Sequence, residues 1–140
     1  MPITEMNHFT VLTDDLEKTR TFYVGLLGLR EGPRPPLGFP GAWLYAGERP
    51  VLHVIAGRAL PAERRGVLDH MAFSATGVSD VTARLEAAGI AYDLRRQTET
   101  NAWQLFVFDP NGARVELDFD ASEPAVSEHY AAKTVSKSEK

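Results

Sequence analysis

The sequence contains no cysteine among its 140 residues. Disulfide bonds, thiolate zinc sites and cysteine nucleophiles are therefore excluded, and any metal site must use His, Asp, Glu or neutral oxygen ligands. No apolar run approaches the roughly 20 residues that a membrane-spanning helix needs, and the N-terminal residues lack the basic and apolar regions of a secretory signal. We therefore expect a cytoplasmic protein with no membrane partner.

An excess of positive charge is also missing. The chain has 15 Lys and Arg against 19 Asp and Glu, which gives a formal net charge of −4. This balance offers no electrostatic reason to expect a nucleic-acid partner. Hydrophobic residues make up 44% and charged residues 24%, as in soluble globular proteins. A chain of this length can build one domain with a substantial core.

Hydrophobic patterns predict the same order of elements twice along the chain. The elements expected in the first half are a strand over 6–13, a helix over 16–27, a short strand within 30–41, and strands over 42–46 and 51–56. After a polar linker, those expected in the second half are a strand over 68–74, a helix over 78–88, and strands over 91–96, 103–108 and 114–119. Asp14 or Asp15 is the expected cap of the first helix, and Ser79 or Asp80 that of the second.

Polar residues coincide when the two halves are aligned, which indicates an internal repeat. The offset from His8 to His70 is 62 residues, and the offset from His53 to Glu116 is 63. We predict an α+β fold of two tandem βαβββ modules, spanning about 5–57 and 67–120. Their curved mixed sheets are expected to pair and form a metal-binding cleft. The modules form one domain over 1–120, and a polar tail follows over 121–140.

Strand periodicity places the coinciding residues on corresponding faces. Side chains alternate along a strand, so Glu116 lies opposite the apolar face that carries Val115 and Leu117. The same reasoning puts the three histidines on helix-distal faces, which would line one cleft if the modules pair their sheets. Two imidazoles and a carboxylate suit one Fe, Mn, Co, Ni or Zn ion with open positions. The alternative is that each histidine is an ordinary hydrogen-bonded core residue.

Several motifs resemble one known superfamily. They are Asn7-His8, the run Asp15-Leu16-Glu17-Lys18-Thr19-Arg20-Thr21-Phe22-Tyr23 with Leu26-Leu27-Gly28-Leu29, Asp69-His70-Met71-Ala72-Phe73, and Phe108-Asp109-Pro110-Asn111-Gly112 with Val115-Glu116-Leu117. Over residues 5 to 120 the chain resembles the vicinal oxygen chelate superfamily, which includes glyoxalase I, extradiol dioxygenases, fosfomycin-resistance enzymes and bleomycin-binding proteins. The resemblance implies a homodimer.

The resemblance also implies a ligand set and shows departures from it. Metal ligands of the superfamily match His8, His70 and Glu116, with a fourth at His53. Glyoxalase I usually carries Glu at the position of His53. Extradiol dioxygenases and fosfomycin enzymes carry Tyr at the position of Phe106, whereas the Thr of the fosfomycin enzymes is matched by Thr10. No subfamily fits in every position.

The expected function is that of a divalent-metal-dependent lyase, isomerase or dioxygenase. Its small substrate would be chelated through two neighbouring oxygens, with Glu116 or His53 moving a proton. The substrate-binding residues are predicted to be Thr10, Gln104 and Phe106. His53 is open to three roles, namely fourth ligand, base or plain cleft residue. The alternative function is a non-catalytic protein that binds a drug or metabolite.

Two further features, Gln104 and a loop, have two interpretations each. Gln104 either orients a substrate oxygen or satisfies a backbone group. The Pro-rich loop over 32–41, which carries Phe39, is either a lid over the cleft or a rigid connector. His129 lies beyond the repeat and is expected at the surface.

Overall fold

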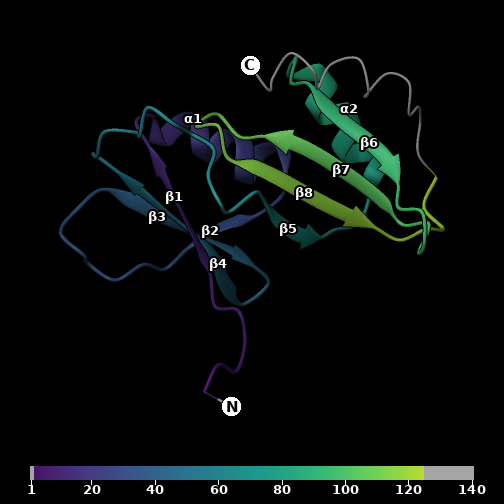
Figure 1. Ribbon diagram of the computed structural model, residues 1–140. Coiled ribbons are helices and arrows are strands. Elements are labelled where there is room, and N and C mark those ends of the chain that lie inside the picture. The colour runs from purple at the N-terminus through teal and green to yellow at the C-terminus, as the bar shows by residue number, and fades with distance from the viewer. Residues whose placement is uncertain (1, 125–140) are drawn as a thin grey trace. The chain divides into compact units, whose positions relative to one another are not determined.

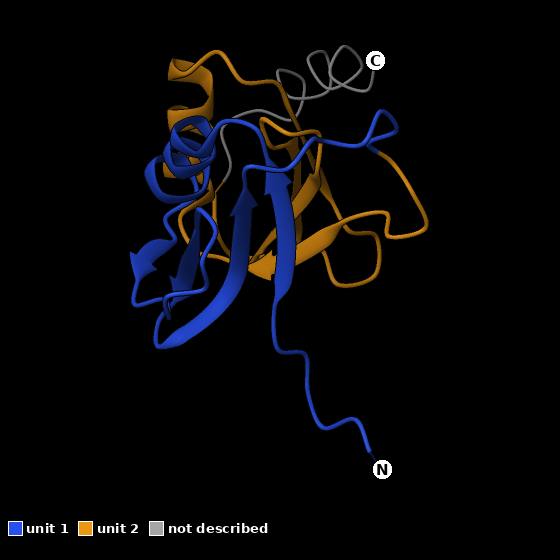
Figure 2. Ribbon diagram, turned by 90° about the vertical axis from the view of Figure 1, so that its left-hand side faces the viewer, with its two compact units in different colours: residues 1–64 blue, residues 65–140 orange. Residues whose placement is uncertain are grey.

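The computed structural model of the protein describes residues 2–124 of the chain. The chain divides into two compact units, residues 1–64 (unit 1) and residues 65–140 (unit 2), shown in different colours in Figure 2. Each unit contains one βαβββ module, so the predicted tandem repeat is confirmed. Among the described residues, no helix combines the length and apolar character needed to span a bilayer. His129 lies outside the described residues.

Unit 1 is built on a four-stranded mixed sheet (Figure 1). Its elements are β1 (Phe9–Thr13), α1 (Leu16–Arg20), η1 (Thr21–Leu26), β2 (Arg30–Gly32), β3 (Gly41–Ala46) and β4 (Arg49–Ala56). The strand order is β1-β4-β3-β2, in which β1 runs parallel to β4 and the other neighbours are antiparallel. Every strand expected in this half is present.

The helix of unit 1 starts where its capping residue predicts. The side chain of Asp15 accepts a hydrogen bond from the Lys18 backbone N–H at 3.1 Å, which satisfies one of the free donors of the first turn. The helix is α-helical over α1 and widens into a π-helix over η1. Gly28 follows it with a φ of 89°, a left-handed conformation that glycine adopts without steric cost.

Unit 2 repeats the arrangement with a second four-stranded mixed sheet. Its elements are β5 (Met71–Ser74), α2 (Val78–Ala87), β6 (Tyr92–Arg96), β7 (Trp103–Phe108) and β8 (Arg114–Phe119). The strand order is β5-β8-β7-β6, and again only the first pair is parallel. Buried side chains of α2, including Val81 and Leu85, form the core of this unit with the apolar faces of β7 and β8.

The cap of α2 differs from the prediction of Ser79 or Asp80. The N-cap is Gly77, and the carboxylate that accepts from the backbone N–H groups of Gly77 and Val78, at 3.0 and 2.8 Å, belongs to Glu123. A negative charge there also complements the helix dipole. Local capping patterns could not reveal this residue, because it lies 46 positions away in the sequence.

Strand registers confirm the repeat residue by residue. Thr10 pairs with His53 in unit 1, and Ala72 pairs with Glu116 in unit 2. The starts of two strands were predicted too early. β1 and β5 begin at Phe9 and Met71, so His8 and His70 each precede a strand instead of lying within it, because pairing with the parallel partner begins one residue later.

The Pro-rich loop before β3 is held by three hydrogen bonds. The hydroxyl of Tyr45 donates to the Pro33 carbonyl at 2.5 Å, and Arg34 Nη2 donates to the Phe39 carbonyl at 2.8 Å. The Ala56 N–H donates to the Pro40 carbonyl at 2.9 Å. These bonds fix the loop to its own sheet, which favours the rigid connector over the lid.

Candidate functional site

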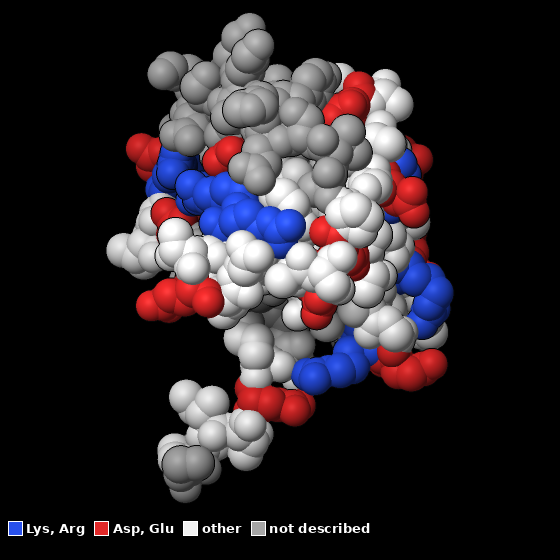
Figure 3. Space-filling view, turned by 90° about the vertical axis from the view of Figure 1, so that its right-hand side faces the viewer, with Lys and Arg blue, Asp and Glu red and all other residues white. Residues whose placement is uncertain are grey.

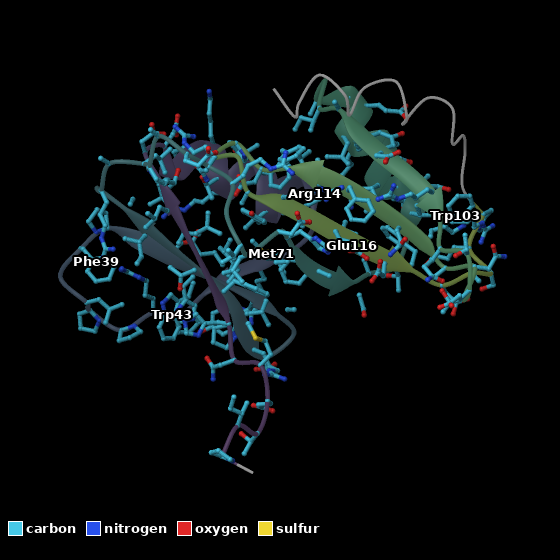
Figure 4. The ribbon with its side chains drawn as sticks, viewed as in Figure 1. Phe39, Trp43, Met71, Trp103, Arg114 and Glu116 are labelled. Atoms are coloured by element: carbon cyan, nitrogen blue, oxygen red, sulfur yellow. The ribbon has the colours of Figure 1, made fainter. Side chains whose placement is uncertain are left out.

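A histidine and a carboxylate lie side by side in unit 2. Nε2 of His70 is 2.8 Å from Oε1 of Glu116. The other oxygen of Glu116 accepts a hydrogen bond from Nε2 of Gln104 at 3.0 Å. Figure 4 shows Glu116 on β8, and its side chain is only 8% exposed. Both carboxylate oxygens are therefore held in place, and Gln104 positions Glu116.

The charged form of Glu116 is stabilised by its surroundings. Burial alone would raise its pKa, because desolvation penalises a carboxylate. Hydrogen bonds with Asp118 and Gln104, together with the charge of His70, outweigh burial and lower the pKa of Glu116. Glu116 is thus an anion at neutral pH, which is the form that binds a cation.

Asp118 is a second carboxyl group on this face that the sequence analysis did not select. It lies two residues after Glu116 and opposite both Ser74 and Gln104. Burial, followed by the hydrogen bond and the negative charge of Glu116, raises its pKa to about 6. Its Oδ1 is buried without a hydrogen-bond partner among the described residues. Asp118 could have been selected from the sequence, because it lies two residues after Glu116 and alternate residues of a strand share a face.

Replacing Asp118 with asparagine is expected to stabilise metal-free protein above pH 6 and to change little at pH 4. Because the pKa is raised in the folded state, folded Asp118 keeps its proton between about pH 4 and 6, whereas the unfolded chain has released it. The free energy of unfolding therefore falls as the pH rises through this range, and above it ionised Asp118 destabilises the folded protein. A displacement of this size corresponds to roughly 3 kcal/mol, and partial solvation reduces it to about 1 kcal/mol. Thermal unfolding of both proteins in EDTA, from pH 4 to 8, measures the difference. An equal effect at all pH values would contradict it.

Unit 1 brings the other two predicted histidines together as stacked rings. The centroids of His8 and His53 lie 3.6 Å apart with an interplanar angle of 15°. Trp43 stacks on the opposite side of His53 at 4.1 Å and 9°. Thr10 is paired with His53 in the sheet and is exposed. Sequence reasoning did not select Trp43, although its pairing with His53 follows from the register of β3 and β4.

The environment of His53 keeps its ring neutral at physiological pH. Burial lowers the pKa of His53, and electrostatic interactions with His8 and Arg34 lower it further, against a hydrogen bond with the Pro50 backbone. Its Nε2 is buried without a hydrogen-bond partner among residues 2–124. A neutral imidazole with an available lone pair can accept a proton.

The stacking has a consequence for ligand geometry. The lone pair of an imidazole nitrogen lies in the plane of its ring, and the rings of His8 and His53 are nearly parallel at 3.6 Å. Two such lone pairs do not converge on one ion between them. This arrangement favours a base for His53 over a fourth ligand alongside His8.

Phe106 lies under two arginine side chains. The guanidinium carbons of Arg95 and Arg114 are each 4.5 Å from its ring centroid, and the ring of His70 meets it edge-on at 5.8 Å. Phe106 is 5% exposed, and it packs against these neighbouring side chains. Figure 3 shows several groups of Lys and Arg side chains with Asp and Glu side chains near them, so both signs of charge occur together on that face.

Each unit carries part of the predicted donor set. Unit 2 holds an imidazole against a carboxylate, and unit 1 holds two imidazoles, one of which has a buried nitrogen without a partner among the described residues. Within residues 2–124, no group of three or more His, Asp or Glu side chains is suited to hold a metal ion. Nitrogen and carboxylate oxygen donors of this kind suit first-row divalent metals.

Comparison with known proteins identifies the family. Residues 5–117 match the model of the Glyoxalase/Bleomycin resistance protein/Dioxygenase superfamily. Because this match spans most of the chain, the protein belongs to that superfamily. The resemblance inferred from the motifs is confirmed, as is the fold of two βαβββ modules.

Individual relatives agree with this assignment. "Glyoxylase I 4" from Arabidopsis thaliana is 30% identical over 123 residues, which cover 82% of this chain and 70% of that protein. A lactoylglutathione lyase from Agrobacterium tumefaciens has a TM-score of 0.57 at 20% identity, covering 85% of this chain and 96% of the other. A mutant of the fosfomycin resistance protein FosX from Listeria monocytogenes, complexed with Mn(II) and 1S,2S-dihydroxypropylphosphonic acid, has a TM-score of 0.67 at 18% identity, covering 84% and 93%. These two structures show likeness of fold.

Proposed function

We propose that the protein is a divalent-metal-dependent enzyme that acts on a small substrate chelated through two neighbouring oxygens. His8, His70 and Glu116 would hold the metal. The observation that carries the proposal is the contact of 2.8 Å between His70 Nε2 and Glu116 Oε1. The Mn(II) complex of FosX, a relative in fold, supports a metal of this class.

Side chains of the proposed site determine which group accepts a proton from the substrate. Bound metal would act as a Lewis acid that stabilises negative charge on substrate oxygens. His53 is a neutral imidazole and is proposed to remove a proton from the substrate at neutral pH. Gln104 fixes Glu116 in one orientation. Thr10, beside His53 on its sheet, is proposed to bind a substrate oxygen.

A lyase or isomerase reaction is favoured over a dioxygenase reaction. The residue at position 106 is a phenylalanine packed against two guanidinium groups, so it offers no hydroxyl to a catecholate. The relatives named glyoxylase I and lactoylglutathione lyase support the same choice.

We propose that the enzyme works as a cytoplasmic homodimer, and light scattering of the purified protein measures its oligomeric state.

Metal analysis of purified protein tests the proposal. We expect about one Mn, Fe, Co, Ni or Zn ion per chain, which chelation removes and titration restores. Only the metal-loaded protein should convert α-oxoaldehyde hemithioacetals or related vicinal oxygen compounds. Chelated protein should remain folded by circular dichroism, because each unit has its own apolar core. Metal-free protein that still binds such a compound with full affinity would instead indicate the non-catalytic binding protein.

A further inference from the structure

Arg34 of unit 1 is a half-buried cation without an acidic partner. It lies in the Pro-rich loop before β3, and its Nη2 donates to the Phe39 carbonyl at 2.8 Å. Among residues 2–124, no Asp or Glu forms an ion pair with Arg34. A guanidinium is always charged in proteins, and charges that are taken out of water are normally paired with an opposite charge. The missing partner therefore needs an explanation.

Two polar side-chain atoms of unit 1 are buried without a hydrogen-bond partner among the described residues. They are Nε of Arg34 and Nε2 of His53. Nη1 of Arg34 also makes no hydrogen bond in that part of the chain, but it is reached by solvent. The large majority of buried side-chain polar atoms in native proteins have a partner. Both residues therefore indicate a group that the described part of the chain does not itself supply.

Arg34 and His53 lie within electrostatic range of each other. Burial is the main cause of the lowered pKa of His53, and the charge of Arg34 contributes to it. Arg34 lies against the first residue of β3, since a Cβ at Gly41 would be 3.0 Å from its Nη2. Trp43, two positions further along β3, stacks on the ring of His53. The guanidinium is thus held near the proposed base by contacts within unit 1 alone.

The loop holds the guanidinium in place before any ligand binds. The ring of Phe39 packs against it, with 5.1 Å between the guanidinium carbon and the ring centroid, and Figure 4 shows Phe39 on this loop. The hydrogen bond from Tyr45 to the Pro33 carbonyl fixes the start of the loop to β3. A group that is already oriented loses little conformational freedom when it binds a ligand. The open Nη1 edge of Arg34 is therefore preorganised to donate hydrogen bonds.

We propose that Arg34 is a substrate-binding residue that pairs with a carboxylate of the substrate. The planar donors of a guanidinium match the planar oxygens of a carboxylate. The pairing supplies the negative charge that Arg34 lacks in unit 1, and it places the substrate near His53. The assignment of this carboxylate to a substrate rests on the proposed function, whereas its binding to Arg34 does not.

The first test measures anion binding to metal-free protein in EDTA. Lactate and the uncharged lactamide are titrated by calorimetry, and the Nε–H signal of Arg34 is followed in ¹H–¹⁵N spectra. We expect lactate to bind more tightly than lactamide and to shift that signal. Arg34→Gln should weaken the binding of lactate about tenfold to hundredfold, since hydrogen bonds to charged groups contribute on this scale, and should leave the binding of lactamide unchanged.

Two further variants serve as controls for this titration. Arg58→Gln removes an exposed arginine of the same unit and should change nothing. Arg34→Lys keeps the charge but not the planar fork, so its affinity for lactate should lie between those of the native protein and Arg34→Gln. Circular dichroism checks that each variant is folded, and Arg34→Lys provides the comparison if Arg34→Gln is not.

The second test compares two matched substrates with metal-loaded protein. Hemithioacetals of one α-oxoaldehyde with 3-mercaptopropionate and with its methyl ester differ in the charge of one carboxyl group. We expect the native protein to prefer the carboxylate about tenfold or more in kcat/KM, on the same scale as the binding of a charged group. Arg34→Gln should lose this preference, mainly through a higher KM.

The outcomes separate this inference from the proposed function. Equal binding of lactate and lactamide by the native protein, or equal losses of both in Arg34→Gln, would overturn the inference, because an arginine with only a structural role does not distinguish them. Native protein that binds lactate through Arg34 but converts neither hemithioacetal would refute the proposed enzyme and leave the carboxylate site standing. Conversion of both hemithioacetals without preference would overturn the assignment of the carboxylate to the substrate.

Discussion

His70→Ala protein is expected to lose stoichiometric divalent metal and, with it, all metal-dependent activity. The ring of His70 contacts Glu116 directly, at 2.8 Å, so its removal deletes a proposed ligand and leaves one oxygen of the carboxylate without this partner. We expect the affinity to fall by more than the roughly hundredfold upper range for an outer-shell partner. Elemental analysis and calorimetric titration of the purified variant measure it. Full retention of metal would refute the proposed ligand set.

The matched control for this experiment is His53→Phe. A phenyl ring keeps the stack between His8 and Trp43 but has no nitrogen. If His53 is a base, the variant binds metal like the native protein and loses about a hundredfold or more in kcat, since general bases contribute on this scale. If His53 is a fourth ligand, metal affinity falls together with activity. The pair of variants therefore separates ligand from base.

Gly41→Ala is expected to be strongly destabilising although it adds only one methyl group. A Cβ at Gly41 would lie 2.1 Å from the carbonyl oxygen of Val54. The obstacle is backbone of the neighbouring strand β4, which cannot rotate away like a side chain. Overpacking typically costs 1–3 kcal/mol, and we expect about 2–3 kcal/mol in the free energy of unfolding, measured by urea denaturation.

The control for Gly41→Ala is Gly66→Ala. Nothing lies within 4 Å of a Cβ at Gly66, and its φ is outside the left-handed region. We expect a change within about 0.5 kcal/mol, as for other surface substitutions. Equal effects at the two positions would mean that the approach of β3 to β4 near Val54 is not tight in solution.

Sequence alone predicted the features that depend on periodicity. The offsets between His8 and His70 and between His53 and Glu116 are reproduced in the strand registers, where Thr10 pairs with His53 and Ala72 with Glu116. Period-two alternation needs no knowledge of distant residues. It was enough to place His53 and Glu116 at corresponding positions of β4 and β8.

The features that escaped prediction depend on contacts between distant residues or on side-chain geometry. The capping of α2 by Glu123 joins segments 45 residues apart. The parallel stacking of His8, His53 and Trp43 depends on side-chain torsions that strand periodicity does not encode. The high pKa of Asp118 arises from burial and from Glu116, so composition could not distinguish it from an ordinary surface aspartate.

The capping of α2 by Glu123 also determines how much of the chain unit 2 needs. The backbone carbonyl of Glu123 accepts from Trp103 Nε1 at 2.7 Å, and that of Pro124 accepts from Ser79 Oγ at 2.8 Å. Residues after β8 thus return across the sheet to the amino end of α2. A chain shortened directly after Phe119 would keep every strand of unit 2 but would leave the first turn of its helix without an acceptor. Any attempt to express or transplant the second half of this protein should therefore extend at least through Pro124.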